Sequence, residues 1–349
     1  MSPHPRRLPY SFYSSLPKVD LHRHLEGSLR FETLRELART QGLELPPTAE
    51  LRSLVQIQAD EPYSFENFLS KFATLRLFYR SAAIITRIAR EAVLDAAADN
   101  VRYLELRFTP VALSKAQNFS LANVMDWVIA GVQQAQAESN IQTRLIASVN
   151  RHEDVALAAQ VSYLAAERIE AGIVGLDLAG NEAEFPAQPF AEIFRDARNK
   201  GLHVTIHAGE WGGANNITQA ISEFGAERIG HGIRILESPQ AIQLALQTGT
   251  TFEVCITSNY QSGAVKSASP HPLRRMLELG LDVTINTDDP SISQINLSDE
   301  YRRACEQLGL SLERLRGRVL AAARAAFLPE SEKQELIRSL QDGFPSLPA

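Results

Sequence analysis

The residues of this chain that could do chemistry are histidines and carboxylates gathered in four short segments. The first reads His22-Arg-His-Leu-Glu26 and holds two imidazoles at positions i and i+2, which project from the same face of a strand. The other three are His207-Ala-Gly-Glu210, Gly230-His231-Gly232 and Asn286-Thr-Asp-Asp-Pro290. Three histidines and one aspartate suit zinc, with iron or another divalent metal as alternatives. A metal held in this way lowers the pKa of a bound water toward about 7 and prepares it for nucleophilic attack.

Glu210 and His231 remain free for proton transfer beside such a metal. Each segment also has a structural interpretation, because the glycines beside His231 can make a turn and Asp288 and Asp289 can cap a helix. The functional interpretation depends on convergence: every segment follows a predicted strand, and the carboxyl ends of the strands of a barrel meet at one face.

Eight short runs rich in Val, Ile and Leu predict the strands that position these groups. The runs are 19–24, 101–108, 144–150, 172–178, 202–207, 228–231, 251–256 and 281–286. Helical patterns lie between them, at 31–40, 120–139, 153–170, 190–200, 217–224 and 270–279. The alternation predicts an α/β fold, a (β/α)₈ TIM-type barrel. A doubly wound open sheet is the structural alternative, but no predicted strand is followed by a Gly-rich phosphate loop.

The domain organisation follows from the same pattern. Residues 1–15 are expected to form a loosely ordered N-terminal tail, and residues 16–340 a single metal-dependent barrel domain. Residues 42–100 carry more helical material than one crossover needs, which predicts extra helices inserted after the first strand. Such an insertion lies at the catalytic end of a barrel, so we expect it near the mouth of the active site.

Composition excludes several classes of protein. The 349 residues carry a formal net charge of −6, which argues against a nucleic-acid-binding surface. Two cysteines are too few for a disulfide framework or a Cys-rich zinc site, so a reducing, cytoplasmic setting is expected. No run approaches the ~18 apolar residues of a membrane helix. The oligomeric state is not readable from the sequence.

At the polar segments the sequence resembles the adenosine deaminase family of the amidohydrolase superfamily. The matching segments are 16–27, 175–182, 207–210, 228–232, 257–259 and 286–290, in the order of the family. The resemblance implies one zinc ion held by His22, His24, His207 and Asp288. It implies that Glu210 shares a proton with purine N1 and that His231 orients and deprotonates the attacking water.

The resemblance also implies how a purine would be bound. Asp289 would contact N7, the Gly180 backbone would contact N3, and His24 and Glu26 would line the substrate side of the site. An apolar lid would be formed by Phe65, Phe68, Leu69 and Phe72, although their helical spacing by itself is more typical of a core.

The activity implied is hydrolytic deamination of adenosine and 2′-deoxyadenosine to inosine and 2′-deoxyinosine with release of ammonia, a reaction of purine salvage. Attack at C6 breaks the aromaticity of the ring, so N1 must gain a proton. A carboxyl group whose pKa is raised by a dry site can supply it. The only partner expected is therefore a small-molecule purine nucleoside, with no nucleic acid and no membrane.

One position departs from the pattern of the family. Adenosine deaminases usually have Asp where this chain has Glu26, and relatives that act on free adenine commonly carry Glu there. Adenine, aminodeoxyfutalosine and N6-methyl-AMP therefore remain alternative substrates. The last is disfavoured at this stage because Glu26 would repel a 5′-phosphate.

Three other classes of site or protein are possible. A two-metal amidohydrolase often uses a lysine at the end of strand four, but no lysine occurs between Lys115 and Lys200. A zinc site of the cytidine-deaminase type needs a Pro-Cys-x-x-Cys element, which is absent. A barrel kept only for binding would not need the complete set of metal and proton-transfer residues.

Several further residues are assigned structural roles. His203 is expected to pack at the far end of the barrel, His152 to lie in a surface loop at the catalytic rim, and His271 to be solvated. Glu105 and Arg107 share one face of a strand and are expected to pair with each other. The remaining expectation is that Asp177 supports the site and that Ser258 and Asn259 support Asp288.

Overall fold

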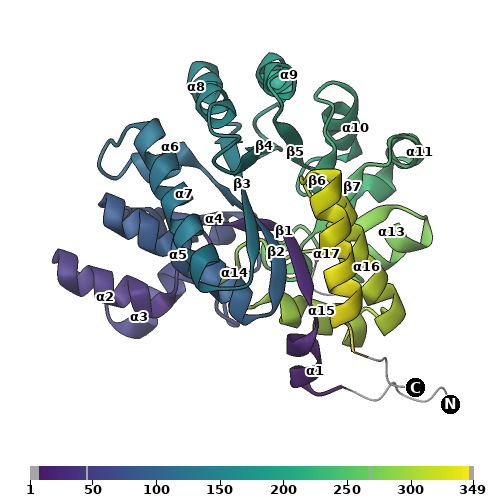
Figure 1. Cartoon of the computed structure of the whole chain (residues 1–349), viewed down its shortest axis with the longest axis horizontal. Coiled ribbons are helices and arrows are strands. Elements are labelled where there is room, and N and C mark those ends of the chain that lie inside the picture. The colour runs from purple at the N-terminus through teal and green to yellow at the C-terminus, as the bar shows by residue number, and fades with distance from the viewer. Residues whose placement is uncertain (1–7, 45, 267–268, 346–349) are drawn as a thin grey trace.

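The computed structural model describes residues 8–44, 46–266 and 269–345, and its centre is an eight-stranded parallel barrel (Figure 1). The strands are β1 (Lys18–His24), β2 (Val101–Phe108), β3 (Gln142–Asn150), β4 (Ile173–Ala179), β5 (His203–Ala208), β6 (Arg228–His231), β7 (Thr251–Val254) and β8 (Asp282–Ile285). They are hydrogen-bonded in sequence order. The predicted (β/α)₈ barrel is confirmed, and every predicted strand is present within two residues of its expected limits.

The barrel is closed between β8 and β1 largely by polar groups. The backbone N–H of Asp288 donates to the carbonyl of His22 at 2.8 Å, and the N–H of His24 donates to the carbonyl of Asp288 at 2.8 Å. Nearer the other end, the Asn286 side chain accepts from the N–H of Leu21. These contacts fix Asp288 against the end of β1, beside the two histidines.

Helices surround the strands. The α-helices are α1 (Tyr10–Ser15), α2 (Phe31–Gln41), α3 (Thr48–Val55), α4 (Phe65–Leu75), α5 (Ala82–Ala98), α6 (Pro110–Ser114), α7 (Leu121–Glu138), α8 (Val155–Ala166), α9 (Ala191–Asn199), α10 (Ala214–Ser222), α11 (Pro239–Thr248), α12 (Ile256–Gln261), α13 (Leu273–Glu278), α14 (Pro290–Ser293), α15 (Leu297–Glu306), α16 (Leu312–Ala325) and α17 (Glu330–Gly343). Three 3₁₀ helices are η1 (Arg76–Phe78), η2 (Gln188–Phe190) and η3 (Ile233–Glu237).

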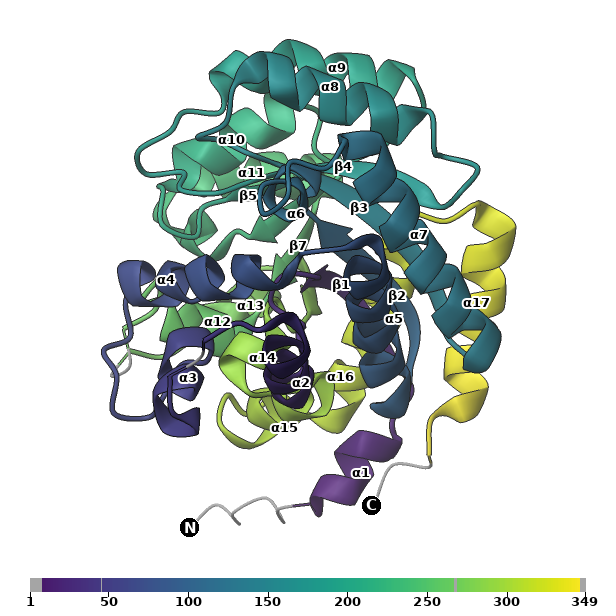
Figure 2. The ribbon, with the colours of Figure 1, turned by 90° about the vertical axis from the view of Figure 1, so that its left-hand side faces the viewer.

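The segment 42–100 forms α3, α4, η1 and α5, as the expected helical insertion after β1. Figure 2 shows α2, α3 and α4 grouped on one side of the barrel. The N-terminus of α4 is capped by the Ser64 hydroxyl, which accepts from the N–H of Asn67 at 3.2 Å. This cap fixes where the helix starts, and with it the face that Phe68 and Leu69 present to the barrel mouth.

Two expectations about the chain are corrected. The predicted tail is not loose throughout: α1 buries Tyr13, whose side chain is 2% exposed, and the Tyr10 hydroxyl bonds Asn296 at the start of α15. The run 251–256 does not continue as a strand, because β7 ends at Val254 and α12 begins at Ile256. The buried Glu300 carboxylate accepts the backbone N–H of Thr257 and so supports the start of that helix. In the described residues no helix is long and apolar enough to cross a membrane.

Candidate active site

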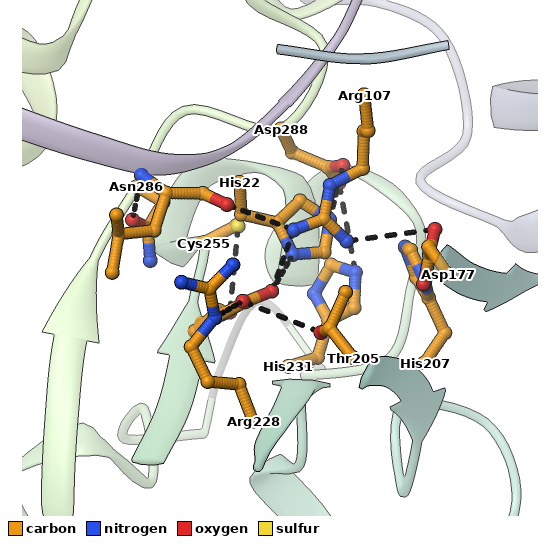
Figure 3. Close-up of polar contacts among 12 residues, drawn as sticks. His22, Arg107, Asp177, Thr205, His207, Arg228, His231, Cys255, Asn286 and Asp288 are labelled. Atoms are coloured by element: carbon orange, nitrogen blue, oxygen red, sulfur yellow. Dashed lines mark hydrogen bonds and ion pairs between the residues drawn. The ribbon is translucent and has the colours of Figure 1, made fainter. Parts of the chain in front are cut away.

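Four of the predicted metal-binding side chains meet at the carboxyl ends of the strands. His22 and His24 come from β1, His207 from β5, and Asp288 from the loop after β8; one ligand atom from each lies within 4.8 Å of all the others. Nε2 of His22 and Nε2 of His24 lie 3.2 and 3.3 Å from Asp288 Oδ1, and Nε2 of His24 lies 3.3 Å from Nε2 of His207. Figure 3 shows His22, His207 and Asp288 directed toward one another.

The outer nitrogens of two of these imidazoles are hydrogen-bonded to buried carboxylates. His22 Nδ1 lies 2.8 Å from Glu253 Oε2, and His207 Nδ1 lies 3.0 Å from Asp177 Oδ1. A carboxylate accepts, so each Nδ1 carries the proton and each Nε2 presents a lone pair to the centre of the cluster. His22 Nε2 is buried and has no hydrogen-bond partner in the described structure. Metal–ligand distances of about 2.0–2.2 Å place ligand atoms about 3 Å apart, so this donor set fits a divalent ion.

A buried guanidinium connects the two supporting carboxylates. Arg107, on β2, donates to Glu253 Oε2 at 2.7 Å and lies 3.5 Å from Asp177 Oδ2 (Figure 3). Burial alone raises the pKa of Glu253, but Arg107 and Arg228 outweigh it and hold that pKa well below its ordinary value. The expected ion pair between Glu105 and Arg107 is wrong, because Glu105 pairs with Arg228 instead. Asp177 supports the site as expected.

Replacing Glu253 with Gln is expected to weaken metal retention by about 10- to 100-fold, the usual effect of losing the partner of a metal-bound imidazole. An amide can donate as well as accept, so it no longer selects the His22 tautomer that has a free lone pair at Nε2. The measurement is the rate of zinc release to a coloured chelator. Asp99→Asn is the matched control, since Asp99 is also buried but bonds Ser298 far from the cluster. Equal release rates in the two variants would contradict the assignment.

Glu210 and His231 lie next to the metal cluster and to each other. His231 Nε2 is 3.5 Å from Glu210 Oε2 and 3.8 Å from Asp288 Oδ2. Burial, with the negative charges of Asp288 and Glu182, raises the pKa of Glu210 well above its ordinary value. Burial lowers the pKa of His231 well below its ordinary value. Burial therefore favours the protonated form of the Glu210 carboxyl group and the neutral form of the His231 imidazole.

The backbone at this point is strained. His231 has φ of 60° and Asp288 has φ of 66°, in the left-handed region that residues with a side chain rarely adopt. Gly230 lets the imidazoles pack closely: a Cβ there would lie 3.0 Å from His22 Cε1 and 3.3 Å from the Cα of His207. The glycine beside His231 is thus a packing requirement of the cluster as well as part of a turn.

Glu182, for which the sequence suggested no role, holds the loop that carries Glu210. Its carboxylate accepts the backbone N–H groups of Gly209 at 2.9 Å, Glu210 at 2.6 Å and Trp211 at 2.8 Å. Glu182 ends the segment 175–182, which resembles the family. Its bonds to residues 209–211 span 27 to 29 positions, so no local pattern in the sequence indicates them.

A cavity of about 240 Å³ opens beside the cluster. It is lined by His24, Glu26, Phe68, Leu69, Phe72, Arg76, Thr109, Ala112, Asn150, His152, Ala179, Gly180, Asn181, His207, Glu210, Trp211, His231, Asp288 and Asp289. All the predicted substrate-binding residues are in this set except Phe65, whose ring packs on Trp211 with centroids 4.2 Å apart. A larger cavity of about 530 Å³ at the opposite end, beside His203, contains none of the predicted site residues.

Several buried polar atoms at this cavity have no partner in the described structure: Glu26 Oε2, Asp289 Oδ1, Trp211 Nε1 and Arg76 Nε. Burial, with the charges of Asp288 and Glu26, raises the pKa of Asp289 well above its ordinary value, so its carboxyl group can donate a hydrogen bond. Gly27 makes room for it, because a Cβ at Gly27 would lie 1.8 Å from Asp289 Oδ1. Unpartnered donors and acceptors at one cavity are what a polar ligand requires.

Glu26 is held at one oxygen only. Its Oε1 accepts the backbone N–H of Thr109 at 2.6 Å, while Oε2 is free to meet a ligand.

Two residues of the cavity, Arg76 and Trp211, were missed from the sequence. Arg76 lies at the junction of α4 and η1, shortly after Phe72, the last of the apolar residues that the sequence singled out for the lid. Trp211 directly follows Glu210, and this neighbourhood was the one sign in the sequence that it lies at the site.

The structure changes the assignments of three polar residues. His271 is buried at 4% exposure rather than solvated, and its Nε2 lies 3.2 Å from Asn259 Oδ1. Asn259 contacts His231 Nδ1 at 3.0 Å and not Asp288, whereas Ser258 does bond Asp288, at 2.6 Å. His152 is exposed at the rim, as expected, but it also lines the cavity.

Cys255 also lies close to the cluster, within 4.8 Å of ligand atoms of His231 and Asp288. Burial and the nearby carboxylates raise the pKa of its thiol well above the ordinary value. The candidate ligand set remains the nitrogen and oxygen donors of His22, His24, His207 and Asp288, with Cys255 beside it.

The parallel barrel, with three imidazoles and one carboxylate at the carboxyl ends of its strands, defines the architecture of a metal-dependent hydrolase of the amidohydrolase type. The family model described as "Adenosine deaminase" matches residues 17–343. The chain belongs to the adenosine deaminase family. It is 38% identical over 333 residues to an adenosine deaminase of Klebsiella pneumoniae, covering 95% of this chain and 99% of the relative. It is 41% identical over 324 residues to an adenosine deaminase of Erwinia tasmaniensis, covering 92% of this chain and 96% of the relative.

Solved structures with the same fold include relatives of more than one specificity. An adenine deaminase from Arthrobacter aurescens superposes with a TM-score of 0.86 at 28% identity, over 94% of this chain and 98% of that one. The N6-methyl-AMP deaminase of Arabidopsis thaliana superposes with a TM-score of 0.84 at 30% sequence identity, over 96% of this chain and 98% of that one. An amidohydrolase from Burkholderia ambifaria, solved with bound Zn, superposes with a TM-score of 0.87 at 27% sequence identity, over 96% of this chain and 92% of that one.

Proposed function

We propose that the protein catalyses the hydrolytic deamination of adenosine and 2′-deoxyadenosine to the corresponding inosines, with release of ammonia, as a step of purine salvage. The observation that carries the proposal is the meeting, at one cavity, of the cluster His22, His24, His207 and Asp288 with Glu210, a buried carboxyl group of raised pKa. Relatives named adenosine deaminase across nearly the whole chain support the same substrate.

We assign the resident metal as one zinc ion per chain, held by His22, His24, His207 and Asp288. The lone pairs at His22 Nε2 and His207 Nε2 are set by Glu253 and Asp177, which supports the choice of ligands. When bound, the ion supplies Lewis acidity that makes a water nucleophilic at neutral pH.

The residues of the chain then hold and protonate the purine. Glu210 carries the proton that N1 gains as C6 is attacked, because burial and the neighbouring carboxylates raise its pKa and favour the protonated form. Asp289 donates to N7 through its unpartnered carboxyl group, and the Gly180 backbone faces N3. Phe68, from α4, covers the cavity and excludes water, which strengthens these interactions.

The substrate is tested with a panel measured by ultraviolet absorbance and ammonia release: adenosine, 2′-deoxyadenosine, adenine, N6-methyl-AMP and aminodeoxyfutalosine. We expect the two nucleosides to have the highest kcat/KM, because the cavity is also lined by polar residues that suit a ribose, Thr109, Asn150 and Asn181. A clear preference for adenine would overturn this choice and identify Glu26, the residue that departs from the pattern of the family, as its cause.

A second candidate substrate class has one observation in its favour. Arg76 lines the same cavity, and its Nε has no partner in the described structure. A guanidinium suits an anionic 5′ substituent such as the phosphate of N6-methyl-AMP or the carboxylate of aminodeoxyfutalosine. This weakens the argument that Glu26 would repel a phosphate. The positive charge of Arg76 acts on the Glu26 carboxyl group, and one oxygen of that group already accepts the backbone N–H of Thr109. Faster turnover of either anionic compound than of adenosine would select this class.

A further inference from the structure

His271 makes a local hydrogen bond at the start of the helix that follows it. It lies just before α13, and its Nδ1 accepts the backbone N–H of Leu273 at 3.1 Å. The ring is 4% exposed, and burial lowers its pKa to about 3, so the imidazole is neutral at physiological pH. A neutral imidazole has one N–H group. Because Nδ1 accepts a backbone proton, that N–H group is at Nε2.

The proton at Nε2 fixes the orientation of the next side chain. His271 Nε2 lies 3.2 Å from Asn259 Oδ1, so the imidazole donates and the amide oxygen accepts. The amide nitrogen of Asn259 then lies 3.0 Å from His231 Nδ1, to which it donates. Turning the amide over would place its NH₂ group against the N–H of His271, two donors facing each other. The direction of this chain of bonds therefore follows from a backbone N–H that cannot be reversed.

The other side of the His231 ring faces two carboxyl groups. Nε2 of His231 lies 3.5 Å from Glu210 Oε2 and 3.8 Å from Asp288 Oδ2. The Asp288 carboxylate can only accept, so a hydrogen at Nε2 is compatible with this side of the ring. The tautomer is set by the donor that faces Nδ1.

We propose that His271, acting through Asn259, is a positioning residue that holds His231 as the Nε2–H tautomer. In this tautomer Nε2 is a donor, so His231 enters the reaction by donating a hydrogen bond toward the attacking oxygen. The family resemblance had suggested that His231 takes a proton from the water. An Nε2 that already carries hydrogen does not accept one, so the Asp288 carboxylate, whose Oδ2 lies 3.8 Å from Nε2, is left as the acceptor of that proton. The consequence for turnover rests on the proposed deamination, but the tautomer itself does not.

The direct test is ¹⁵N NMR of the zinc-loaded enzyme labelled with ¹⁵N-histidine, in which the long-range ¹H–¹⁵N couplings distinguish protonated from unprotonated ring nitrogens. His231 is assigned among the eight histidines as the set of signals lost in His231→Asn. We expect a protonated Nε2 and an unprotonated Nδ1. A protonated Nδ1 in the wild-type enzyme would overturn the proposal even if the enzyme deaminates adenosine.

Three variants then test which residues set the tautomer. Asn259→Asp replaces the donor by an acceptor and should move the proton of His231 to Nδ1. His271→Leu removes the donor to Asn259 and should give a mixture of tautomers. His271→Gln can accept from Leu273 and donate to Asn259, so it is the matched control and should restore the wild-type spectrum. Identical tautomers in all three variants would refute the role of His271 and Asn259.

Kinetics separate positioning from a purely structural role. With the wrong tautomer, Asn259→Asp should lower kcat by about 10²- to 10⁴-fold, the scale known for a misoriented catalytic imidazole, and KM should change only a few-fold. His271→Leu should lie between this variant and the wild type, with His271→Gln close to the wild type. If folded Asn259→Asp lost thermal stability but kept its kcat, Asn259 and His271 would have only a structural role, and the proposal would be wrong.

Discussion

The Glu210→Gln variant is expected to keep its metal and to lose adenosine turnover by about 10²- to 10⁴-fold, the range for removal of a general acid. Glu210 is 3% exposed, and burial raises its pKa well above the ordinary value, which favours the acid form. A glutamine has nearly the same shape and can still donate a hydrogen bond to N1. It cannot release a proton to the ring, so the barrier of C6 attack is no longer lowered.

The measurements for this variant are kcat, metal content and the dependence of kcat on pH. In the wild-type enzyme kcat should fall as pH rises through the elevated pKa of Glu210, because the acid form is then lost, and this limb should vanish in the variant. Glu237→Gln serves as the control, since Glu237 is exposed and pairs with Arg234 on the surface. Substantial turnover by Glu210→Gln would exclude Glu210 as the acid.

Removing the metal should abolish activity, and restoring zinc should recover it. The cluster holds lone pairs of His22 and His207 and a carboxylate of Asp288 within a few ångströms, and among the described residues His22 Nε2 has no protein partner. Without an ion these groups are left unsatisfied, and nothing polarises the water. Dialysis against a chelator, followed by titration with Zn²⁺ and other divalent ions, tests both the requirement and the identity of the metal.

Elemental analysis of the purified enzyme completes the experiment. We expect one metal per chain, since β4 offers no lysine to bridge a second ion. Two metals per chain would support the two-metal alternative. Full activity after complete removal of metal would contradict the proposed mechanism. The unfolding temperature should fall on chelation, because a ligand that binds only the folded state stabilises it.

The segments of the candidate metal site and the barrel could be predicted from local sequence. His22 and His24 are two positions apart on a strand, so their shared face follows from strand geometry alone. His207, His231 and Asp288 each follow a short apolar run, and a parallel barrel brings the ends of all such runs to one face. Position relative to a strand was therefore sufficient to group residues more than 250 positions apart.

The supporting contacts could not be predicted in this way. Glu105 and Arg107 share a strand face, yet they pair with Arg228 and Glu253, because inside a closed barrel the neighbours across the interior compete with neighbours along the strand. His271 precedes Pro272 at a helix start, a position that is usually solvated, but the fold brings its Nε2 to 3.2 Å from Asn259 Oδ1.

By itself the sequence determined the fold class, the family and the histidines of the candidate metal cluster, because each depends on local patterns and on the order of strands. Only the tertiary structure decided which nitrogen of each imidazole is free. Glu253 and Asp177 leave a lone pair at Nε2 of His22 and His207, whereas Asn259 leaves a proton at Nε2 of His231. The physical reason is that the tautomer of a histidine is set by the partner of its other nitrogen, and these partners lie on other strands and helices.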